Sequence, residues 1–297
     1  NFQNINMEFQ LSDLVSRNIL YDSQEIKNTL DNKSVLITGA GGSIGSELCK
    51  QVFFYNCKKI ILIDMSEYNL FRIVNLIHKL KIEKKINTEI VSCLTNLCDK
   101  NNLENLINLH NPEIIFHAAA YKHVKLVEDN IMESYYNNVI GSKNLIDICY
   151  KNSNISNFIL VSTDKAVRPS NFMGKTKRII EIYLSNVAKQ NTKIKYAVVR
   201  FGNVFRSSGS IVPIFSEQIK SGGPITVTAK EVERYFMSIN EAVGLILESG
   251  LTLKPNNIFV LNMGKPIKIY DLACKMISYY GLTIKNEINP RGDIEII

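Results

Sequence analysis

The chain has 297 residues, of which 45% are hydrophobic and 21% charged, and its formal net charge is +7. This composition is ordinary for a globular protein with a sizeable core and excludes an intrinsically disordered chain. The basic residues form no block of five or six like charges and are not interleaved with aromatic residues, so the mild positive charge suits an anionic substrate and gives no support to nucleic-acid binding.

The six cysteines form no C-x-x-C pair, which indicates reduced thiols in a cytoplasmic setting. The four histidines are scattered without zinc-ligand spacing, so no metal site is expected. No apolar run approaches the roughly 18 to 20 residues of a membrane span, and there is no signal peptide. The chain begins with Asn1 rather than Met, and we therefore expect it to be a piece of a longer protein.

The first element in chain order is a polar, asparagine-rich extension over residues 1–33, with a helical pattern from Phe9 to Val15. A short apolar strand over residues 34–37 then leads into T-G-A-G-G-S-I-G at positions 38–45, and residues 46–54 are predicted to be helical. A strand, a glycine turn and a helix in this order are required by a dinucleotide-binding fingerprint.

Each glycine of this turn has a predicted role. Gly39 permits the tight turn, Gly42 lets the backbone approach a pyrophosphate, and Gly45 allows close helix packing. Ser43 and Ile44 open the helix, whose N-terminus favours the phosphates.

A second strand over residues 59–64 ends in Asp64, 19 residues after Gly45. A carboxylate there can hold the ribose hydroxyls of NAD, with Ser66 beside it, and repels the 2′-phosphate of NADP, so NAD is the predicted cofactor. The alternative is that Asp64 merely caps the next turn. A third strand over residues 88–93 precedes Asn96 and Leu97, and the Asn96 amide is a candidate contact of the adenine edge.

The fourth strand, over residues 113–117, leads into Ala118, Ala119 and Ala120, which are small enough to let the backbone pass beneath a flat ligand. Lys122 and His123 follow as candidate substrate contacts, although a surface lysine and a histidine at a helix start explain them equally well. A helix predicted over residues 134–150 carries Asn138, a further candidate for cofactor binding.

The fifth strand, over residues 158–161, ends in the polar run Ser162, Thr163, Asp164 and Lys165. Open α/β sheets bind ligands at the carboxyl ends of their strands, and an adjacent acid and base can move protons on neighbouring substrate atoms. Met173 and Lys177 are four residues apart and share one helix face. The alternative interpretation is a solvated loop followed by a helix.

A sixth strand over residues 195–200 completes an alternation of strands and helices that predicts a doubly wound parallel Rossmann sheet, an α/β fold. From residue 205 the pattern changes to loops, helices at 212–220, 240–249 and 269–280, and a late strand at 257–261. We therefore predict an N-terminal extension (1–33), an NAD-binding domain (34–204) and a smaller C-terminal substrate-binding lobe (205–297) interleaved with it.

The lobe offers one cation for the phosphates of a substrate. Arg234 is the candidate, because a guanidinium binds phosphate oxygens bidentately, and a surface ion pair is the alternative.

Six segments together carry a family resemblance over residues 12–297: T-G-A-G-G-S-I-G-S-E (38–47), H-A-A-A-Y-K-H-V (117–124), S-T-D-K-A (162–166), M-G-K-T-K-R (173–178), R-F-G-N-V (200–204) and R-Y-F-M (234–237). With them the chain resembles the extended short-chain dehydrogenase/reductase family acting on nucleotide sugars. Within that family it is similar to the UDP-N-acetylglucosamine 4,6-dehydratases of bacterial polysaccharide biosynthesis and protein glycosylation, especially the large membrane-attached members that begin bacillosamine synthesis.

The resemblance implies a lyase in which tightly bound NAD takes a hydride from carbon 4 and returns it to carbon 6. Lys165 then removes the proton on carbon 5, Asp164 protonates the departing hydroxyl, and Thr163 bonds the carbon-4 oxygen. Lys177 holds the nicotinamide ribose, and Asn203 and Ser210 join the substrate site.

One departure from the wider family lies at Met173, where most members have a tyrosine. A thioether cannot take the carbon-4 hydroxyl proton. The resemblance implies that the large dehydratases share this methionine and that a neighbour such as Asp164 accepts the proton.

The expected partner is a UDP-sugar, with neither nucleic acid nor metal. Membrane attachment is expected through a segment outside this chain, at the cytoplasmic face of the bacterial inner membrane, and self-association is left open. Relatives usually continue past G-D-I-E-I-I, so we expect the C-terminus to be truncated. The rival hypotheses are a nucleotide-sugar epimerase, a dehydratase that inverts carbon 5, and a non-catalytic nucleotide-sugar-binding protein.

Overall fold

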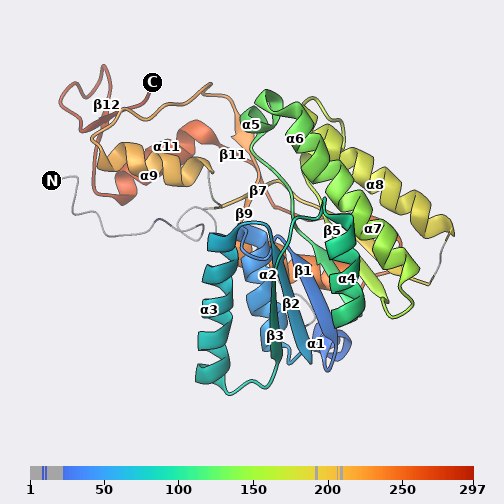
Figure 1. Ribbon diagram of the computed structural model, residues 1–297. Helices are drawn as coiled ribbons and strands as arrows, with labels where there is room; N and C mark the ends of the chain where they lie inside the picture. The colour runs from blue at the N-terminus through green and yellow to red at the C-terminus, as the bar shows by residue number, and fades with distance from the viewer. Residues whose placement is uncertain (1–8, 10, 12–22, 191–192, 206, 208–209) are drawn as a thin grey trace. The chain divides into compact units, whose positions relative to one another are not determined.

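The core of the protein is a seven-stranded parallel β-sheet. The computed structural model describes residues 9, 11, 23–190, 193–205, 207 and 210–297. The sheet has the order β10-β6-β5-β4-β1-β2-β3 (Figure 1). Its strands are β1 (Ser34–Thr38), β2 (Lys59–Asp64), β3 (Glu89–Leu94), β4 (Ile114–His117), β5 (Asn157–Val161), β6 (Lys195–Arg200) and β10 (Asn257–Val260). Neighbouring strands pair in parallel, as expected for apolar runs that are buried on both faces.

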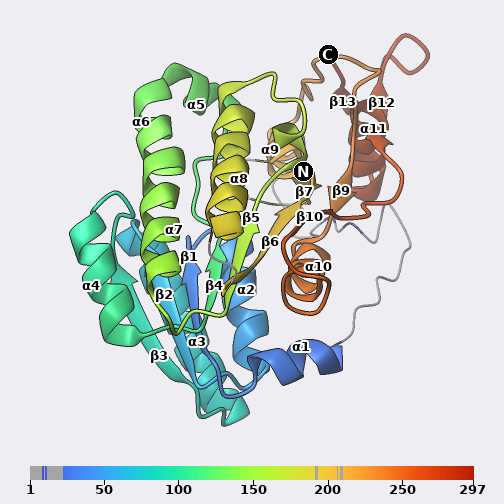
Figure 2. The same cartoon turned by 90° about the vertical axis from the view of Figure 1, so that its right-hand side faces the viewer.

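Helices cover both faces of the sheet, which confirms the predicted doubly wound fold. Figure 2 shows α4 (Lys100–His110), α7 (Ser142–Lys151) and α8 (Phe172–Gln190) on one face, and α1 (Ser23–Leu30), α2 (Ser43–Phe54) and α10 (Ile239–Leu251) on the other. The helix α3 (Glu67–Lys84) packs beside α2. Leucine and isoleucine side chains of α4, α7 and α8 form one continuous core with β4 and β5.

The predicted elements agree with these closely. The six strands expected between residues 34 and 200 match the observed ones to within one residue at each end. The helix expected over residues 134–150 is instead divided into α6 (Ile131–Tyr135), a π-helix η3 (Tyr136–Gly141) and α7, with the short helix α5 (Val124–Asp129) before them. A π-helical turn takes in an extra residue, which the apolar periodicity of the sequence does not reveal.

The chain divides into two compact units. One consists of Tyr21–Phe201 with Ala242–Leu261 and contains the sheet; the other consists of Asn1–Leu20, Gly202–Glu241 and Asn262–Ile297. Residues 242–261, which the sequence places in the C-terminal lobe, therefore return to the first unit. They do so because β10 pairs in parallel with β6 and because Gly250 of α10 lies directly against Ile159 of β5.

The second unit has its own apolar core. The helices α9 (Ile211–Lys220) and α11 (Ile269–Tyr279) contribute Phe215, Leu272 and Met276 to it. Two-residue strands surround them: β7 (Asn203–Val204) with β9 (Phe236–Met237), β8 (Glu233–Arg234) with β11 (Ile267–Lys268), and β12 (Ile284–Lys285) with β13 (Ile294–Glu295).

Three further predictions concern the N-terminal helical piece, membrane-spanning helices and metal ions. Most of the helical piece predicted from Phe9 to Val15 lies outside the described residues. Within the described ranges, no helix combines the length and apolar character needed to cross a bilayer. In the same ranges, no group of three or more histidine, cysteine or acidic side chains is arranged to hold a metal ion.

Candidate active site

The glycine turn between β1 and α2 lies directly against the loop that follows β4. Gly39 has φ +65°, and a Cβ atom there would lie 2.8 Å from the backbone of Ala119. A Cβ atom at Gly45 would lie 1.9 Å from the carbonyl oxygen of Gly39. Both positions therefore require glycine. Gly42 precedes Ser43 and Ile44 in the first turn of α2, which no side chain caps, so this helix end is suited to an anion.

Asp64, at the end of β2, fastens to the same turn. One of its carboxylate oxygens accepts a hydrogen bond from the Gly41 N–H at 2.9 Å and the other from the Ser66 N–H at 2.9 Å. The residue is 8% exposed. A carboxylate has about four acceptor sites, so two backbone bonds leave room for ribose hydroxyls.

A buried histidine joins the glycine turn to the helices behind it. The Nδ1 atom of His117 lies 2.7 Å from the Thr38 hydroxyl, and Nε2 lies 2.7 Å from the Ser142 hydroxyl. Ser142 donates its own proton to the Asn138 carbonyl at 2.6 Å, so Nε2 carries the hydrogen and Nδ1 accepts from Thr38. Burial, assisted by the positive charge of Lys177, lowers the pKa of His117 to about 3, and the ring is therefore neutral.

Asn138 lies in the π-helix and is 3% exposed. Its amide nitrogen donates to the Tyr121 carbonyl at 3.0 Å and to the Thr176 hydroxyl at 3.2 Å, and its oxygen accepts from the Tyr121 N–H at 2.8 Å. Both N–H groups are thus used within the protein. The side chain of Asn138, which was predicted as a cofactor contact, therefore connects the loop after β4 to α8 through hydrogen bonds.

The loop after β3 packs on the same π-helix. A Cβ atom at Gly141 would lie 3.1 Å from Leu97, which is buried, and Asn144 donates to the Leu97 carbonyl at 3.2 Å. Asn96 is exposed, and its side-chain oxygen accepts from the Cys98 N–H at 2.9 Å.

The polar run after β5 forms a short 3-10 helix, η4 (Asp164–Ala166). Thr163 accepts from the Lys165 N–H at 3.3 Å and donates its hydroxyl proton to an Asp164 oxygen at 2.9 Å. The Lys165 ammonium lies 3.1 Å from that same oxygen, and the side chains of Asp164 and Lys165 are 43% and 34% exposed. An acid and a base in direct contact are therefore open to a ligand here.

The first turns of α8 lie against this run. Met173 is 5% exposed, and Lys177 donates to the Val161 carbonyl at 3.0 Å. Burial lowers the pKa of Lys177 to about 8, and the Glu181 carboxylate opposes this shift. A Cβ atom at Gly174 would lie 2.4 Å from the Lys165 carbonyl oxygen, so α8 approaches the backbone of η4 closely. The five predicted catalytic residues are thus brought together within one unit.

The remaining predicted contacts lie on other segments of the chain. Lys122 and His123 are exposed and precede α5. Asn203 opens β7, Ser210 is the N-cap residue of α9, and Arg234 donates to the Glu233 carbonyl at 2.8 Å; all three belong to the second unit.

Sequence reasoning missed three residues that stabilise the cluster. Glu181 follows Lys177 by four residues, a spacing that places both on one helix face and was available as a signal. Glu128 accepts from the Phe172 N–H at 2.6 Å and so caps α8, together with Asn171, which accepts from the Gly174 N–H at 2.8 Å. A contact such as that between Glu128 and Phe172, 44 residues apart, leaves no local pattern.

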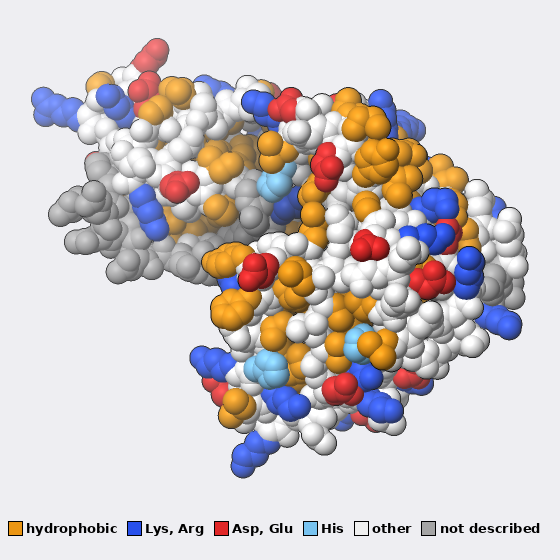
Figure 3. Space-filling view, viewed as in Figure 1, with side chains coloured by type: hydrophobic (Ala, Val, Ile, Leu, Met, Phe, Trp, Pro, Cys, Tyr) orange, Lys and Arg blue, Asp and Glu red, His pale blue; other side chains and the backbone are white. Residues whose placement is uncertain are grey.

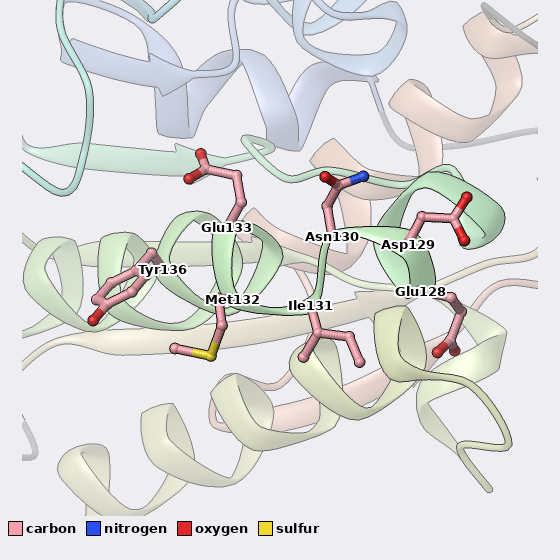
Figure 4. Close-up of a pocket in the computed structure, with 7 residues that line it drawn as sticks. All are labelled: Glu128, Asp129, Asn130, Ile131, Met132, Glu133 and Tyr136. Carbon is pink, nitrogen blue, oxygen red and sulfur yellow. The ribbon is translucent and has the colours of Figure 1, made fainter.

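The surface over α5, α6 and η3 offers a poor site for an anion. An open depression of about 600 Å³ lies over α5, α6 and η3 (Figure 4). Its lining includes three carboxylates, those of Glu128, Asp129 and Glu133, which repel a phosphate. Figure 3 shows hydrophobic side chains gathered over α6 and α8. The exposed apolar residues of these helices include Met132, 63% exposed, and Ile182, 47% exposed, so this surface is apolar and does not suit a phosphate.

Comparisons with known proteins concern the chain as a whole rather than single residues of the site. A family model described as "Polysaccharide biosynthesis protein" matches residues 35–297. The capsular polysaccharide biosynthesis protein CapD of Staphylococcus aureus is 42% identical over 273 residues, which cover 92% of this chain and 45% of CapD. The UDP-N-acetylglucosamine 4,6-dehydratase (inverting) of Campylobacter jejuni is 31% identical over 248 residues, 82% of this chain and 70% of that protein.

Among solved structures, the UDP-glucose 4-epimerase of Thermus thermophilus in complex with NAD has a TM-score of 0.72 at 18% identity and covers 89% of this chain and 85% of that chain. At this identity the likeness concerns the fold alone. This chain spans less than half the length of CapD.

Proposed function

Because this chain belongs to the polysaccharide biosynthesis protein family, with nucleotide-sugar dehydratases and epimerases among its relatives, we propose that it is an NAD-dependent 4,6-dehydratase of UDP-N-acetylglucosamine. The observation that carries the proposal is the contact of Asp164 with Lys165 at the carboxyl end of β5, beside Lys177. An epimerase acting at carbon 4 needs no acid for a departing hydroxyl, whereas a dehydratase needs both an acid and a base.

The residues around the glycine turn fit NAD. Gly39 and Gly45 have no space for a side chain, whereas a Cβ atom at exposed Gly42 would meet only the Gly39 oxygen, at 3.2 Å, so its outer side is open to a pyrophosphate. We assign the pyrophosphate to Gly42, Ser43 and Ile44, and the adenosine ribose to Asp64 with Ser66. We assign the flat rings to the space left by Ala118, Ala119 and Ala120, and the nicotinamide ribose to Lys177. When bound, the cofactor would supply hydride removal at carbon 4 of the sugar and hydride return at carbon 6 after water has left.

The protein's own groups then carry the protons. The Thr163 hydroxyl bonds the carbon-4 oxygen and relays its proton to Asp164, whose oxygen lies 2.9 Å away. Met173 has no proton-accepting role, because a thioether is not a base at neutral pH. The ketone formed at carbon 4 acidifies the proton on carbon 5, which Lys165 removes in its neutral form. Asp164 delivers its proton to the hydroxyl that leaves carbon 6.

The proton transfers in this assignment balance. Asp164 takes one proton from oxygen 4 and gives one to the leaving hydroxyl, and Lys165 takes one from carbon 5 and returns one there. Both groups end in the state in which they began. The Lys165 Nζ atom lies 3.1 Å from the Asp164 carboxylate and the Lys165 side chain is 34% exposed, so both groups of the proposed mechanism are in contact and reachable from solvent.

The test is incubation of the purified chain with UDP-N-acetylglucosamine in deuterated water without added reductant, followed by mass spectrometry and proton NMR. Loss of one water with deuterium at carbon 5 is the expected result, and the configuration at carbon 5 distinguishes a retaining enzyme from an inverting one, the type named for the Campylobacter jejuni relative. An unchanged mass with inversion at carbon 4 would identify an epimerase and overturn the dehydratase. Binding of NAD and nucleotide sugar without turnover would identify a binding protein.

A further inference from the structure

Glu181 is a fully buried carboxylate that none of the steps above uses. Its exposure is 0%, and it accepts hydrogen bonds from the Ser162 hydroxyl at 2.6 Å, from Arg200 Nε at 2.8 Å and from Arg178 at 3.2 Å. A second bond from the Arg200 guanidinium makes that pair bidentate. A charge removed from water is tolerated when it is paired and fully hydrogen-bonded in this way, so the cluster is a built feature of the fold.

One face of α8 contacts the catalytic strand end at three points. Gly174 lies against the Lys165 carbonyl, Lys177 donates to the Val161 carbonyl, and Glu181 accepts from Ser162. Residues 174, 177 and 181 follow the i, i+3, i+7 spacing of one helix face. Val161 and Ser162 are consecutive, so two successive turns of α8 hold two successive residues of the chain that leads into Thr163.

A further contact runs to the neighbouring strand, β6. Arg200 is the last residue of β6, and its guanidinium reaches Glu181 while the Phe201 carbonyl beside it accepts from the Asp164 N–H at 3.0 Å. The ends of β5 and β6 are therefore fixed on α8 through one carboxylate.

We propose that Glu181 is a positioning residue of the candidate active site, which holds the Thr163–Lys165 segment in register with Lys177 through Ser162 and Arg200. The inference rests on the proposed function, because it takes Lys177 and the Asp164–Lys165 pair to be the reacting groups. Glu181 touches neither substrate nor cofactor.

The position of Glu181 one turn beyond Lys177 adds an electrostatic role. Two titratable groups interact with the charge of Lys177, His117 from β4 and Glu181 from α8 itself, and Glu181 is in turn paired with Arg178 and Arg200. His117 is neutral, and Asp164 is paired with Lys165. Burial lowers the pKa of Lys177 to about 8, and Glu181 is the carboxylate that opposes this. Glu181 therefore favours the cationic form of Lys177 near neutral pH.

The experiment measures the titration of Lys177 without requiring turnover. Trace labelling of the folded chain with acetic anhydride between pH 6 and 11, read by peptide mass spectrometry, gives the pKa of individual lysines. In Glu181→Gln the Lys177 midpoint is expected to fall by on the order of one pH unit, the scale set by loss of a nearby opposite charge. Leu184→Ala, a fully buried apolar truncation on the same helix, is the matched control and should leave the midpoint unchanged.

A second variant, Ser162→Ala, removes the hydrogen bond from Ser162 to Glu181 and keeps the charge of Glu181. Ser162→Ala should leave the Lys177 midpoint in place, raise amide hydrogen exchange of residues 163–166 about tenfold through loss of a charge-assisted bond, and lower kcat with KM unchanged. Leu184→Ala should not change exchange in that segment selectively. This variant carries the test if Glu181→Gln does not fold.

The outcomes separate the two proposals. A wild-type midpoint in Glu181→Gln, or wild-type exchange in Ser162→Ala, overturns the positioning role. A shifted midpoint and faster exchange in a chain that does not dehydrate UDP-N-acetylglucosamine would keep the positioning role and overturn the proposed function.

Discussion

Alanine substitutions at Gly42 and Gly45 separate the cofactor-binding role of the glycine turn from its structural role. At Gly45 the new Cβ atom would lie 1.9 Å from the Gly39 carbonyl oxygen, a backbone atom that cannot rotate away. Overpacking of this kind costs about 1–3 kcal/mol. For a folding unit of about 150–250 residues, each kcal/mol lowers Tm by about 2–4 °C, so we expect Gly45→Ala to lower Tm by about 2–12 °C.

At Gly42 the same substitution should leave the fold intact. The residue has φ −71° and ψ 172°, which any residue adopts, and its Cβ atom would meet the Gly39 oxygen alone, at 3.2 Å. The tight contact is offset by about 0.4–1 kcal/mol from the reduced entropy of the unfolded chain. Tm should therefore stay close to the wild-type value, while the added methyl group stands where the pyrophosphate is assigned.

The assay is thermal unfolding of both variants together with calorimetric titration of NAD after removal of copurified nucleotide. Loss of one or two phosphate contacts, about 1–3 kcal/mol, should weaken NAD binding by Gly42→Ala about 5- to 150-fold. Wild-type NAD affinity in Gly42→Ala would refute the assignment of the pyrophosphate to this turn. A wild-type Tm in Gly45→Ala would refute the contact argument itself.

Three further predictions follow from the same contacts. Lys165→Ala should abolish water loss and deuterium entry at carbon 5 without releasing NAD. The control Lys175→Ala removes an exposed lysine from α8 and should leave water loss and deuterium entry unchanged. Dehydration retained in Lys165→Ala would remove Lys165 from the mechanism. Asp64→Ser should narrow the preference for NAD over NADP measured by calorimetry, because the carboxylate that repels a 2′-phosphate is gone, and an unchanged ratio would contradict that role. The free energy of unfolding should fall as pH is lowered from 6.5 toward 3, because His117 takes up a proton in the unfolded chain but not in the folded protein, where its pKa is about 3. In His117→Asn the free energy of unfolding, measured with urea, should change less with pH over this range. An equal change in the variant and the wild type would refute the assignment.

The parallel sheet was predictable because its strands are local patterns. Each of β1, β2, β4 and β5 is an apolar run that ends in glycine, small or polar residues, and such runs can be found without knowledge of their partners. The strand β10 has the same kind of run, yet its place in the sheet depends on pairing with β6, about sixty residues earlier in the chain. A pairing at that separation leaves no local signal. The sequence therefore located the strand and predicted a lobe interleaved with the NAD-binding domain, but not that this strand joins the sheet.

Some residues of the candidate site were likewise predictable from local sequence, and others were not. Gly39 and Asp64 were identifiable from their spacing, and Asp164 and Lys165 from their position after a buried strand. The connection formed by Asn138 was not, because it depends on a π-helical turn and on which atoms the amide meets. Sequence identifies residue types at a sheet edge, whereas hydrogen-bond saturation decides which of them remain available to a ligand.

A continuous series of hydrogen bonds links the glycine turn to α8. The Ala119 N–H donates to the Thr38 hydroxyl at 3.4 Å, and the hydrogen bonds continue through His117 and Ser142 to the carbonyl of Asn138. The Asn138 side chain then bonds Thr176, the residue before Lys177. Each hydroxyl in this chain donates in one direction and accepts in the other, so protonation of His117 at Nδ1 would face Thr38 with a second donor and force its hydroxyl to turn. The neutral imidazole therefore keeps the glycine turn and α8 in a single hydrogen-bonded arrangement, and the proposed mechanism depends on this arrangement because it assigns the cofactor to one end and proton transfer to the other.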